Sequence, residues 1–158
     1  MRPRNDRGAA MIEFIAGTFL VGTLLFSVIQ FGFLWAGQGA VETAAHFAAR
    51  KFAFNARLDL RGAESAALAE ASALCRNRPG GKWEDATLTS IQFSLNGTGG
   101  TPFKARTGEA YKVRLTHGVE LVVPWVNRLL FLLAPIPKTR IDNKYYLFLN
   151  ATRWVTVE

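Results

Sequence analysis

The sequence predicts an α+β fold in which a long N-terminal transmembrane helix is followed by a second, short helix and a small antiparallel β-sheet. Three observations lead to this prediction: a long apolar run near the N-terminus, an alanine-rich segment behind it, and apolar residues that alternate with polar ones in the second half. With 158 residues, of which 49% are apolar and 20% charged, the chain has the size and composition of one folded, membrane-anchored domain.

The first predicted element is the transmembrane helix. Residues 9–36 are apolar or small apart from Glu13, Gln30 and a few hydroxyl side chains. At ~1.5 Å per residue, a helix of this length exceeds the ~30 Å thickness of a hydrocarbon core. Because arginines precede this run, the positive-inside rule predicts that residues 1–8 are a cytoplasmic leader. The alternative is a secretory signal peptide cleaved near residues 36–40, although its apolar core would normally have only about 7–15 residues.

The same helix is expected to continue to about residue 54, so that residues 37–61 form its extracytoplasmic continuation. Small side chains recur at every fourth position along it, and this spacing lets another helix approach closely. For the outer half of this small-residue stripe, packing against the chain's own domain is the alternative. The stripe consists of Gly32, Ala36, Ala40, Ala44 and Ala48.

Residues 62–158 are predicted to form an α+β extracytoplasmic domain. A second helix is expected over residues 63–74, after a break at residues 59–62, and the Pro-Gly-Gly sequence at residues 79–81 marks the loop that follows it. Alternation of apolar and polar residues then predicts strands. These strands are expected over residues 91–95, 111–123 and 145–157, with a Gly-rich turn at residues 96–100 and a bulge at His117 and Gly118.

An apolar segment, residues 124–134, lies between two of the predicted strands. It is too short to span a bilayer, which takes about 20 residues. It can form a buried core helix, or an apolar surface that rests on the bilayer or on a partner subunit. In the second case Trp125 and Arg128 are the expected interfacial anchors, and Leu129 and Leu132 the expected contacts.

Glu13 is the only acidic or basic residue from Met11 to Val41. An ionisable side chain inside a membrane span is costly, which makes it a candidate functional residue. Ala9 lies four residues before Glu13, on the same helix face.

These residues carry a family resemblance. A short basic leader that ends in Gly8, followed by four residues, Glu13 and the aromatic Phe14, resembles the cleavage motif of type IVb prepilins. Residues 7–50 resemble more narrowly the TadE/TadF-like minor pseudopilins of the tight-adherence (Flp) pilus and secretion system. The resemblance implies cleavage between Gly8 and Ala9 by a prepilin peptidase at the inner membrane of a bacterium. Glycine at position 8 lets the backbone lie extended in the protease site, and the cut gives Ala9 a free amine that can pair with the Glu13 carboxylate. The alternative is that the Glu13 carboxylate extends to the lipid headgroups. It also implies three kinds of partner: other pilins or pseudopilins, the inner-membrane pilus assembly platform, and the lipid bilayer.

No other chemistry is indicated by the sequence. His46 and His117 are the only histidines and do not have ligand spacing, and Cys75 is the only cysteine, which excludes an intrachain disulfide. Motifs for a nucleophile or a phosphate loop are absent, and no recognition motif accompanies the net charge of +7. We therefore expect no enzymatic activity, no cofactor, no metal site and no nucleic-acid partner. The alternative function is a signal-anchored extracytoplasmic domain that binds a partner or has an enzyme activity unrelated to pili.

Overall fold

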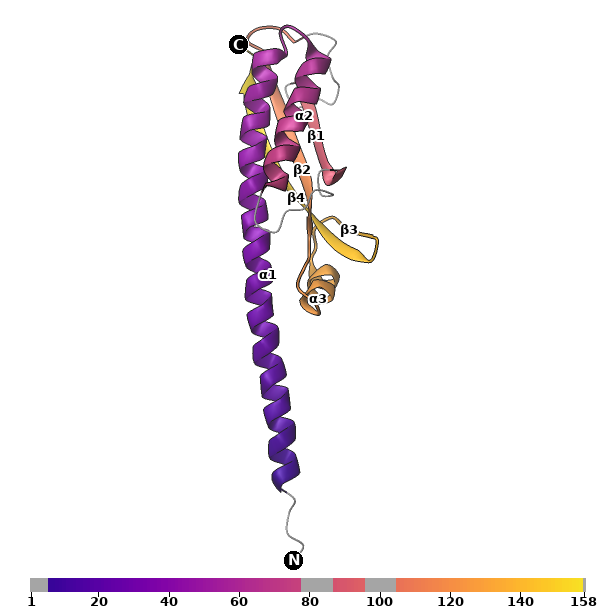
Figure 1. Ribbon diagram of the computed structural model, residues 1–158. Helices are drawn as coiled ribbons and strands as arrows, with labels where there is room; N and C mark the ends of the chain where they lie inside the picture. Colours follow the sequence, from indigo (N-terminus) through magenta and orange to yellow (C-terminus); the bar gives the residue numbers. More distant parts are fainter. Residues whose placement is uncertain (1–5, 78–86, 96–104, 158) are drawn as a thin grey trace, which may run out of the picture.

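A computed structural model of the chain describes residues 6–77, 87–95 and 105–157. It has an α+β fold in which one long helix, α1 (Asp6–Asn55), carries a head formed by the other elements (Figure 1). The head packs on the C-terminal half of α1, and the N-terminal part of α1 extends away from it. The predicted fold class is therefore confirmed.

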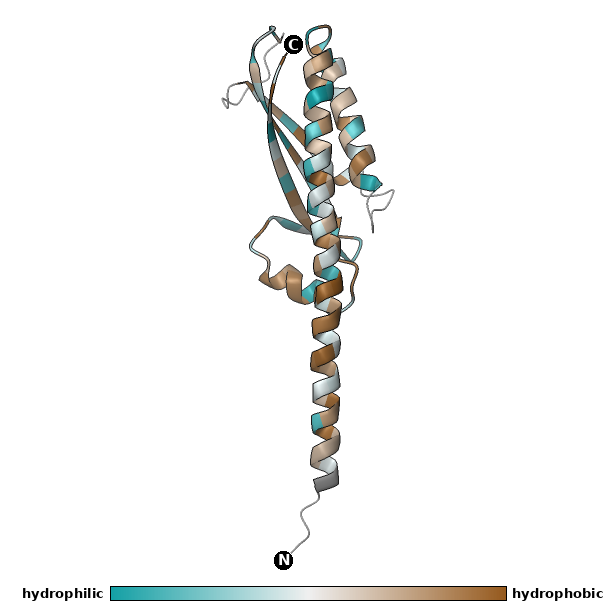
Figure 2. Cartoon of the chain, turned by 90° about the vertical axis from the view of Figure 1, so that its left-hand side faces the viewer, coloured by the Kyte–Doolittle hydropathy of each residue, from teal (hydrophilic) through white to brown (hydrophobic). Residues whose placement is uncertain are grey.

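The free part of α1 is long and apolar enough to cross a membrane. None of the residues in its most apolar window of 18 residues is buried within the chain. Figure 2 shows this part of the helix as mainly apolar up to the level at which the head begins. Membrane anchors and signal sequences both have these properties.

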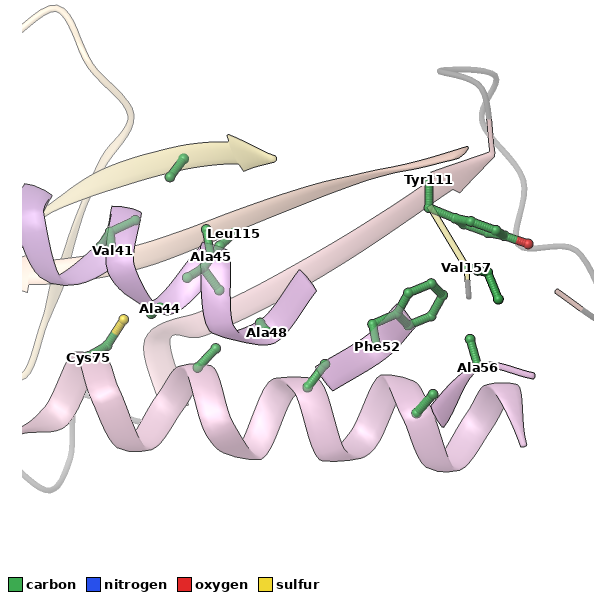
Figure 3. Close-up of a cluster of buried hydrophobic side chains, with 14 of the residues drawn as sticks. Val41, Ala44, Ala45, Ala48, Phe52, Ala56, Cys75, Tyr111, Leu115 and Val157 are labelled. Atoms are coloured by element: carbon green, nitrogen blue, oxygen red, sulfur yellow. The ribbon is translucent and has the colours of Figure 1, made fainter. Parts of the chain in front are cut away.

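The second helix, α2 (Leu60–Arg76), folds back beside α1 (Figure 1). Its buried face consists of small side chains, which allow the two helices to lie close together. Ala44 and Ala48 of α1 are completely buried in the same cluster (Figure 3). The buried residues of α2 recur at every fourth position and are Ala63, Ala67, Ala71 and Cys75.

The N-terminus of α2 lies three residues before the predicted start. The Asp59 side chain accepts a hydrogen bond from the backbone N–H of Arg61 at 3.1 Å, and this N-cap begins the helix at Leu60. Gly62, which was predicted to be part of the break, lies inside the helix. A β-carbon at position 62 would be 2.5 Å from Oδ2 of Asp59, so the glycine leaves room for the cap.

The strands form one antiparallel sheet of four strands in the order β1-β2-β4-β3. The three predicted strands are present, although the second ends at Glu120 and not at residue 123, and β3, which pairs with the start of β4, was not predicted. The predicted Gly-rich turn at residues 96–100 and the loop at residues 79–81 lie outside the described residues. The strands are β1 (Thr89–Leu95), β2 (Ala110–Glu120), β3 (Lys138–Ile141) and β4 (Lys144–Thr156).

The predicted bulge at His117 and Gly118 is wrong, because the pairing of β2 with β4 is continuous from Ala110 to Glu120. His117 is completely buried, and its Nδ1 lies 2.8 Å from the Thr89 hydroxyl on the neighbouring strand. His117 therefore takes an inward-facing position in the apolar alternation of β2, and its buried hydrogen-bond partner lets the strand pairing continue.

The core lies between the sheet and the helices α1 and α2, and Tyr111 and Phe52 are its largest completely buried side chains (Figure 3). The Phe52 ring stacks on Phe93 at 4.2 Å and meets Tyr111 edge-on at 5.2 Å between ring centroids. Burial raises the pKa of Tyr111 to about 12, and the Glu109 carboxylate, which accepts a hydrogen bond from the hydroxyl at 3.2 Å, acts in the same direction. Tyr111 is thus neutral at physiological pH.

At Gly37, α1 lies close to the sheet, because a β-carbon there would be 3.0 Å from Cγ2 of Val119 and 3.3 Å from Cδ1 of Leu149. We expect Gly37→Leu to lower the free energy of unfolding by about 1–3 kcal/mol, because the larger side chain overpacks this contact. Urea unfolding in detergent micelles, followed by circular dichroism, measures the change. Gly39→Leu is the matched control, since a β-carbon there would meet no atom within 4 Å. An equal loss in both variants would show that the helix–sheet contact is not the cause.

Candidate functional site

The residues of the predicted processing motif lie together at the free end of α1. Gly8, Ala9, Glu13 and Phe14 are all helical and exposed, and Phe14 keeps 74% of its surface exposed. A β-carbon at Gly8 would meet no atom within 4 Å. A protease that binds an extended segment must unwind the first turns of α1. Glycine makes this easier, because it costs about 1 kcal/mol relative to alanine in a helix.

Glu13 has no ion pair with any side chain that the structure describes. Ala9 and Glu13 lie four residues apart in one continuous helix, and residues at this spacing are neighbours on a helix surface. The residues on either side of Glu13 in the sequence, Ile12 and Phe14, are exposed apolar side chains. The geometry is therefore compatible with a cation that approaches from the N-terminal turn or from another subunit.

The small-residue stripe divides into two parts. Ala44 and Ala48 are buried in the chain's own core, so this part of the stripe is occupied by the head. Ala36 and Ala40 are partly buried. Gly32 is exposed, and a β-carbon at this position would meet no atom within 4 Å. Only the lower end of the stripe is thus accessible to another helix.

The apolar segment at residues 124–134 forms helix α3 (Val126–Leu133) at the end of the head nearest the free part of α1 (Figure 1). Its exposure excludes the alternative of a buried core helix. Val126 is the only residue of α3 that is buried. The exposed fractions are 76% for Trp125, 50% for Leu129 and 78% for Leu132, and Arg128 is also exposed. All four residues predicted to contact a membrane or a partner therefore lie on the surface.

A strained turn directs the chain into α3. Trp125 has φ 68° and ψ −53°, and the backbone N–H of Val126 donates to the carbonyl of Pro124 at 2.8 Å. This is a γ-turn, a rare conformation that is unfavourable for a bulky residue. It holds the Trp125 side chain on the surface, beside α1.

The N-terminal end of α3 lies against the free part of α1. A groove between the two helices is lined by Phe19, Phe26, Trp125 and Val126, together with small residues of α1. Above it, Gln30 of α1 is completely buried, and its Oε1 accepts a hydrogen bond from the backbone N–H of Val123 at 2.9 Å. Sequence reasoning did not foresee this contact.

Basic side chains next to α3 were also missed, because they belong to the unpredicted strand β3. Lys138 Nζ donates to the carbonyls of Ala134 at 3.1 Å and Leu132 at 3.3 Å, at the C-terminus of α3. The Arg140 guanidinium lies over the Tyr145 ring at 5.4 Å and donates to the Asn143 side chain. Two positive charges thus flank the apolar helix, in addition to Arg128.

Among residues 6–77, 87–95 and 105–157, no group of three or more His, Cys, Asp or Glu residues is arranged to hold a metal ion. The thiol of Cys75 is buried between α2 and α1. Comparisons of the chain with protein-family models, with curated proteins and with solved structures find no match.

Proposed function

We propose that this chain is a minor pilin or pseudopilin that takes part in the assembly of a tight-adherence (Flp, type IVb) pilus in a bacterial inner membrane. A prepilin peptidase cuts it between Gly8 and Ala9 on the cytoplasmic face. The observation that carries the proposal is the isolated carboxylate of Glu13, five residues after Gly8, at the free end of a long apolar helix. After cleavage the Ala9 amine supplies the positive charge that this carboxylate lacks.

The division of α1 into two parts supports this proposal. Its free part presents apolar side chains on all sides, and only its other part is used to carry the head. A helix that is apolar all round is suited to lipid or to the interior of a helical assembly. The protein would therefore remain anchored through this part and associate through it with other pilins or with the assembly platform.

The packing of the head argues against removal of the apolar helix as a signal peptide near residues 36–40. Such a cut would remove Gln30 and its hydrogen bond to Val123. The shortened α1 would then begin next to Val41, a completely buried core residue. The cut would also remove Gly37 from its contact with Val119. A short signal peptide does not normally contribute to the folded core of the mature protein. Cleavage after Gly8 removes none of these contacts.

Processing is tested by Gly8→Val in the native host. We expect the precursor to accumulate, because a β-branched side chain clashes where the peptidase binds an extended backbone at glycine. The measurement is the ratio of precursor to mature chain on a gel, with the mature N-terminus identified by mass spectrometry. The wild-type chain should begin at Ala9.

The matched control is Gly17→Val, which places the same side chain in the same helix where a β-carbon meets no atom within 4 Å. It should be processed like the wild type. Normal processing of Gly8→Val would remove the motif from the proposal. A wild-type N-terminus near Val41 would indicate a secreted domain, and one at Met1 or Arg2 an uncleaved anchor.

A further inference from the structure

The exposed face of α3 lies beside the part of α1 that is apolar enough to cross a membrane. We propose that α3 is a second membrane anchor, which inserts into the lipid leaflet on the side of the head. This inference rests on one part of the proposed function, the passage of α1 through a bilayer, and does not depend on cleavage after Gly8.

The position of α3 along α1 is the first argument. A hydrocarbon core of ~30 Å takes about 20 residues of helix, so a core that begins after Gly8 extends to about Val28. Trp125 shares a groove with Phe19 and Phe26, which lie within this range. The N-terminal end of α3 is therefore level with the membrane span itself.

The side chains of α3 are the second argument. Trp125, Leu129, Leu132 and Leu133 point outward with exposed fractions of 76, 50, 78 and 67%. Their spacing places them on one side of a short helix. Figure 2 shows α3 as an apolar element next to the apolar part of α1. Because Trp125 lines one groove together with Phe19 and Phe26, lipid that surrounds α1 at this level also reaches α3 without a further partner.

The backbone of α3 is the third argument, because polar backbone groups need partners inside a membrane. At its N-terminus, the backbone N–H groups of Val126 and Asn127 donate to the carbonyls of Pro124 and Val123, and that of Arg128 donates to the Asn127 side chain. At its C-terminus, Lys138 donates to several carbonyls of the last turn. The ends of α3 thus have partners that do not require water.

The charges around α3 are the fourth argument. Arg128 on α3 and Arg140 on the adjacent strand β3 are exposed basic residues. Long basic side chains keep their charge at the headgroups while their stems cover apolar surface. They are attracted to lipid phosphates, and particularly to anionic lipids. An apolar face bordered by basic residues is typical of a helix that lies in a membrane interface.

Spin labels at three exposed leucines test the proposal. The full chain is reconstituted in vesicles of phosphatidylethanolamine and phosphatidylglycerol, and Cys75→Ala removes the only native thiol. Single variants Leu132→Cys, Leu24→Cys and Leu58→Cys place the label on α3, on the free part of α1 and at the far end of the head. The native leucines are 78, 60 and 85% exposed. The measurement compares relaxation by molecular oxygen, which enters lipid, with relaxation by a water-soluble nickel chelate.

We expect the ratio of oxygen to nickel relaxation at Leu132 to match that at Leu24 and to exceed that at Leu58 about tenfold, because a polar chelate is excluded from hydrocarbon. If the label at Leu24 is in lipid and that at Leu132 in water, α3 is not inserted and this inference fails, whereas the passage of α1 through the bilayer stands. A label at Leu132 that neither reagent reaches also overturns it, since the face is then covered by protein. If Leu24 is in water, α1 does not cross the bilayer and both proposals fail.

A second measurement avoids the cysteine variants, in case Cys75→Ala does not fold. Vesicles that contain brominated lipids quench the fluorescence of tryptophans that contact the acyl chains. We expect Trp125→Phe to reduce the quenched fraction, and Trp154→Phe, which changes a residue 59% exposed on the sheet, to leave the quenched emission unchanged. An unchanged quenched fraction in Trp125→Phe would contradict insertion of α3.

Discussion

Replacement of Phe52 by alanine is expected to lower the free energy of unfolding of the head by about 3–5 kcal/mol, the usual cost of removing a large aromatic ring from a core. Phe52 is completely buried and joins α1 to the sheet through its stacking on Phe93 at 4.2 Å and its contact with Tyr111. The residues around it are mostly alanines, which have no side-chain freedom with which to fill the space. Because small domains are stable by only about 5–15 kcal/mol, this ring supplies a substantial share of the stability of the head.

The same helix provides the control. Phe54 is two residues further along α1 and is 77% exposed, so Phe54→Ala should change the free energy of unfolding by less than about 0.5 kcal/mol. Urea unfolding of each full-length variant in detergent micelles, followed by circular dichroism, gives the difference. A similar decrease in the free energy of unfolding in both variants would show that the substitutions act through the helix propensity of α1 and not through the core.

The elements that the sequence predicts well are those whose pattern is long. The alternation from Tyr111 to Val119 identifies β2, and that from Ile91 to Leu95 identifies β1, because period two over several residues is typical of a half-buried strand. The fourfold recurrence of small residues likewise identifies the packed faces of α1 and α2. These patterns arise directly from burial on one face of each element.

Strand β3 could not be predicted in this way, because it is short and lies at the edge of the sheet. Its four residues are mostly exposed and carry no apolar alternation. The hairpin that joins it to β4 uses Asp142 and Asn143 with φ 46° and 65°, a turn in which Asn-Gly is the stronger signal. The start of α2 was missed for a similar reason, since the cap at Asp59 overrides the tendency of Gly62 to end a helix.

The two candidate regions differ in how much the sequence reveals. The segment from Gly8 to Phe14 is local, so its spacing is visible without any tertiary structure. The position of α3 is not local, because Trp125 meets Phe19 and Phe26 only after the whole head has folded onto α1. An apolar stretch of this length has the same pattern whether the helix is buried or exposed, and the sequence therefore left both alternatives open.

Glu13→Ala is expected to be cleaved like the wild type and to reduce the number of pili per cell at least about tenfold, because loss of as little as ~1.4 kcal/mol of pairing energy changes an equilibrium tenfold. Glu13 is exposed on the free part of α1 and does not contact the head, so the substitution leaves the fold intact. The number of pili should depend on the negative charge at position 13. Glu13→Gln should behave like the alanine variant, and Glu13→Asp should restore part of the function.

Pili are counted by electron microscopy, and processing of each variant is measured in the same cells. Glu42→Ala is the matched control, since it removes the same carboxylate from the same helix in the part that carries the head. Glu42 accepts a hydrogen bond from the Gln38 side chain at 3.0 Å and approaches Arg153 at 4.0 Å, both on the surface, where such contacts contribute little. Normal piliation with Glu13→Ala would show that the isolated carboxylate has no role in assembly. A defect in cleavage would instead assign Glu13 to recognition by the peptidase. Measuring processing and piliation in the same cells separates a role of Glu13 in assembly from a role in recognition by the peptidase. The charge series then tests whether cleavage supplies a positively charged partner for Glu13 or merely removes the leader.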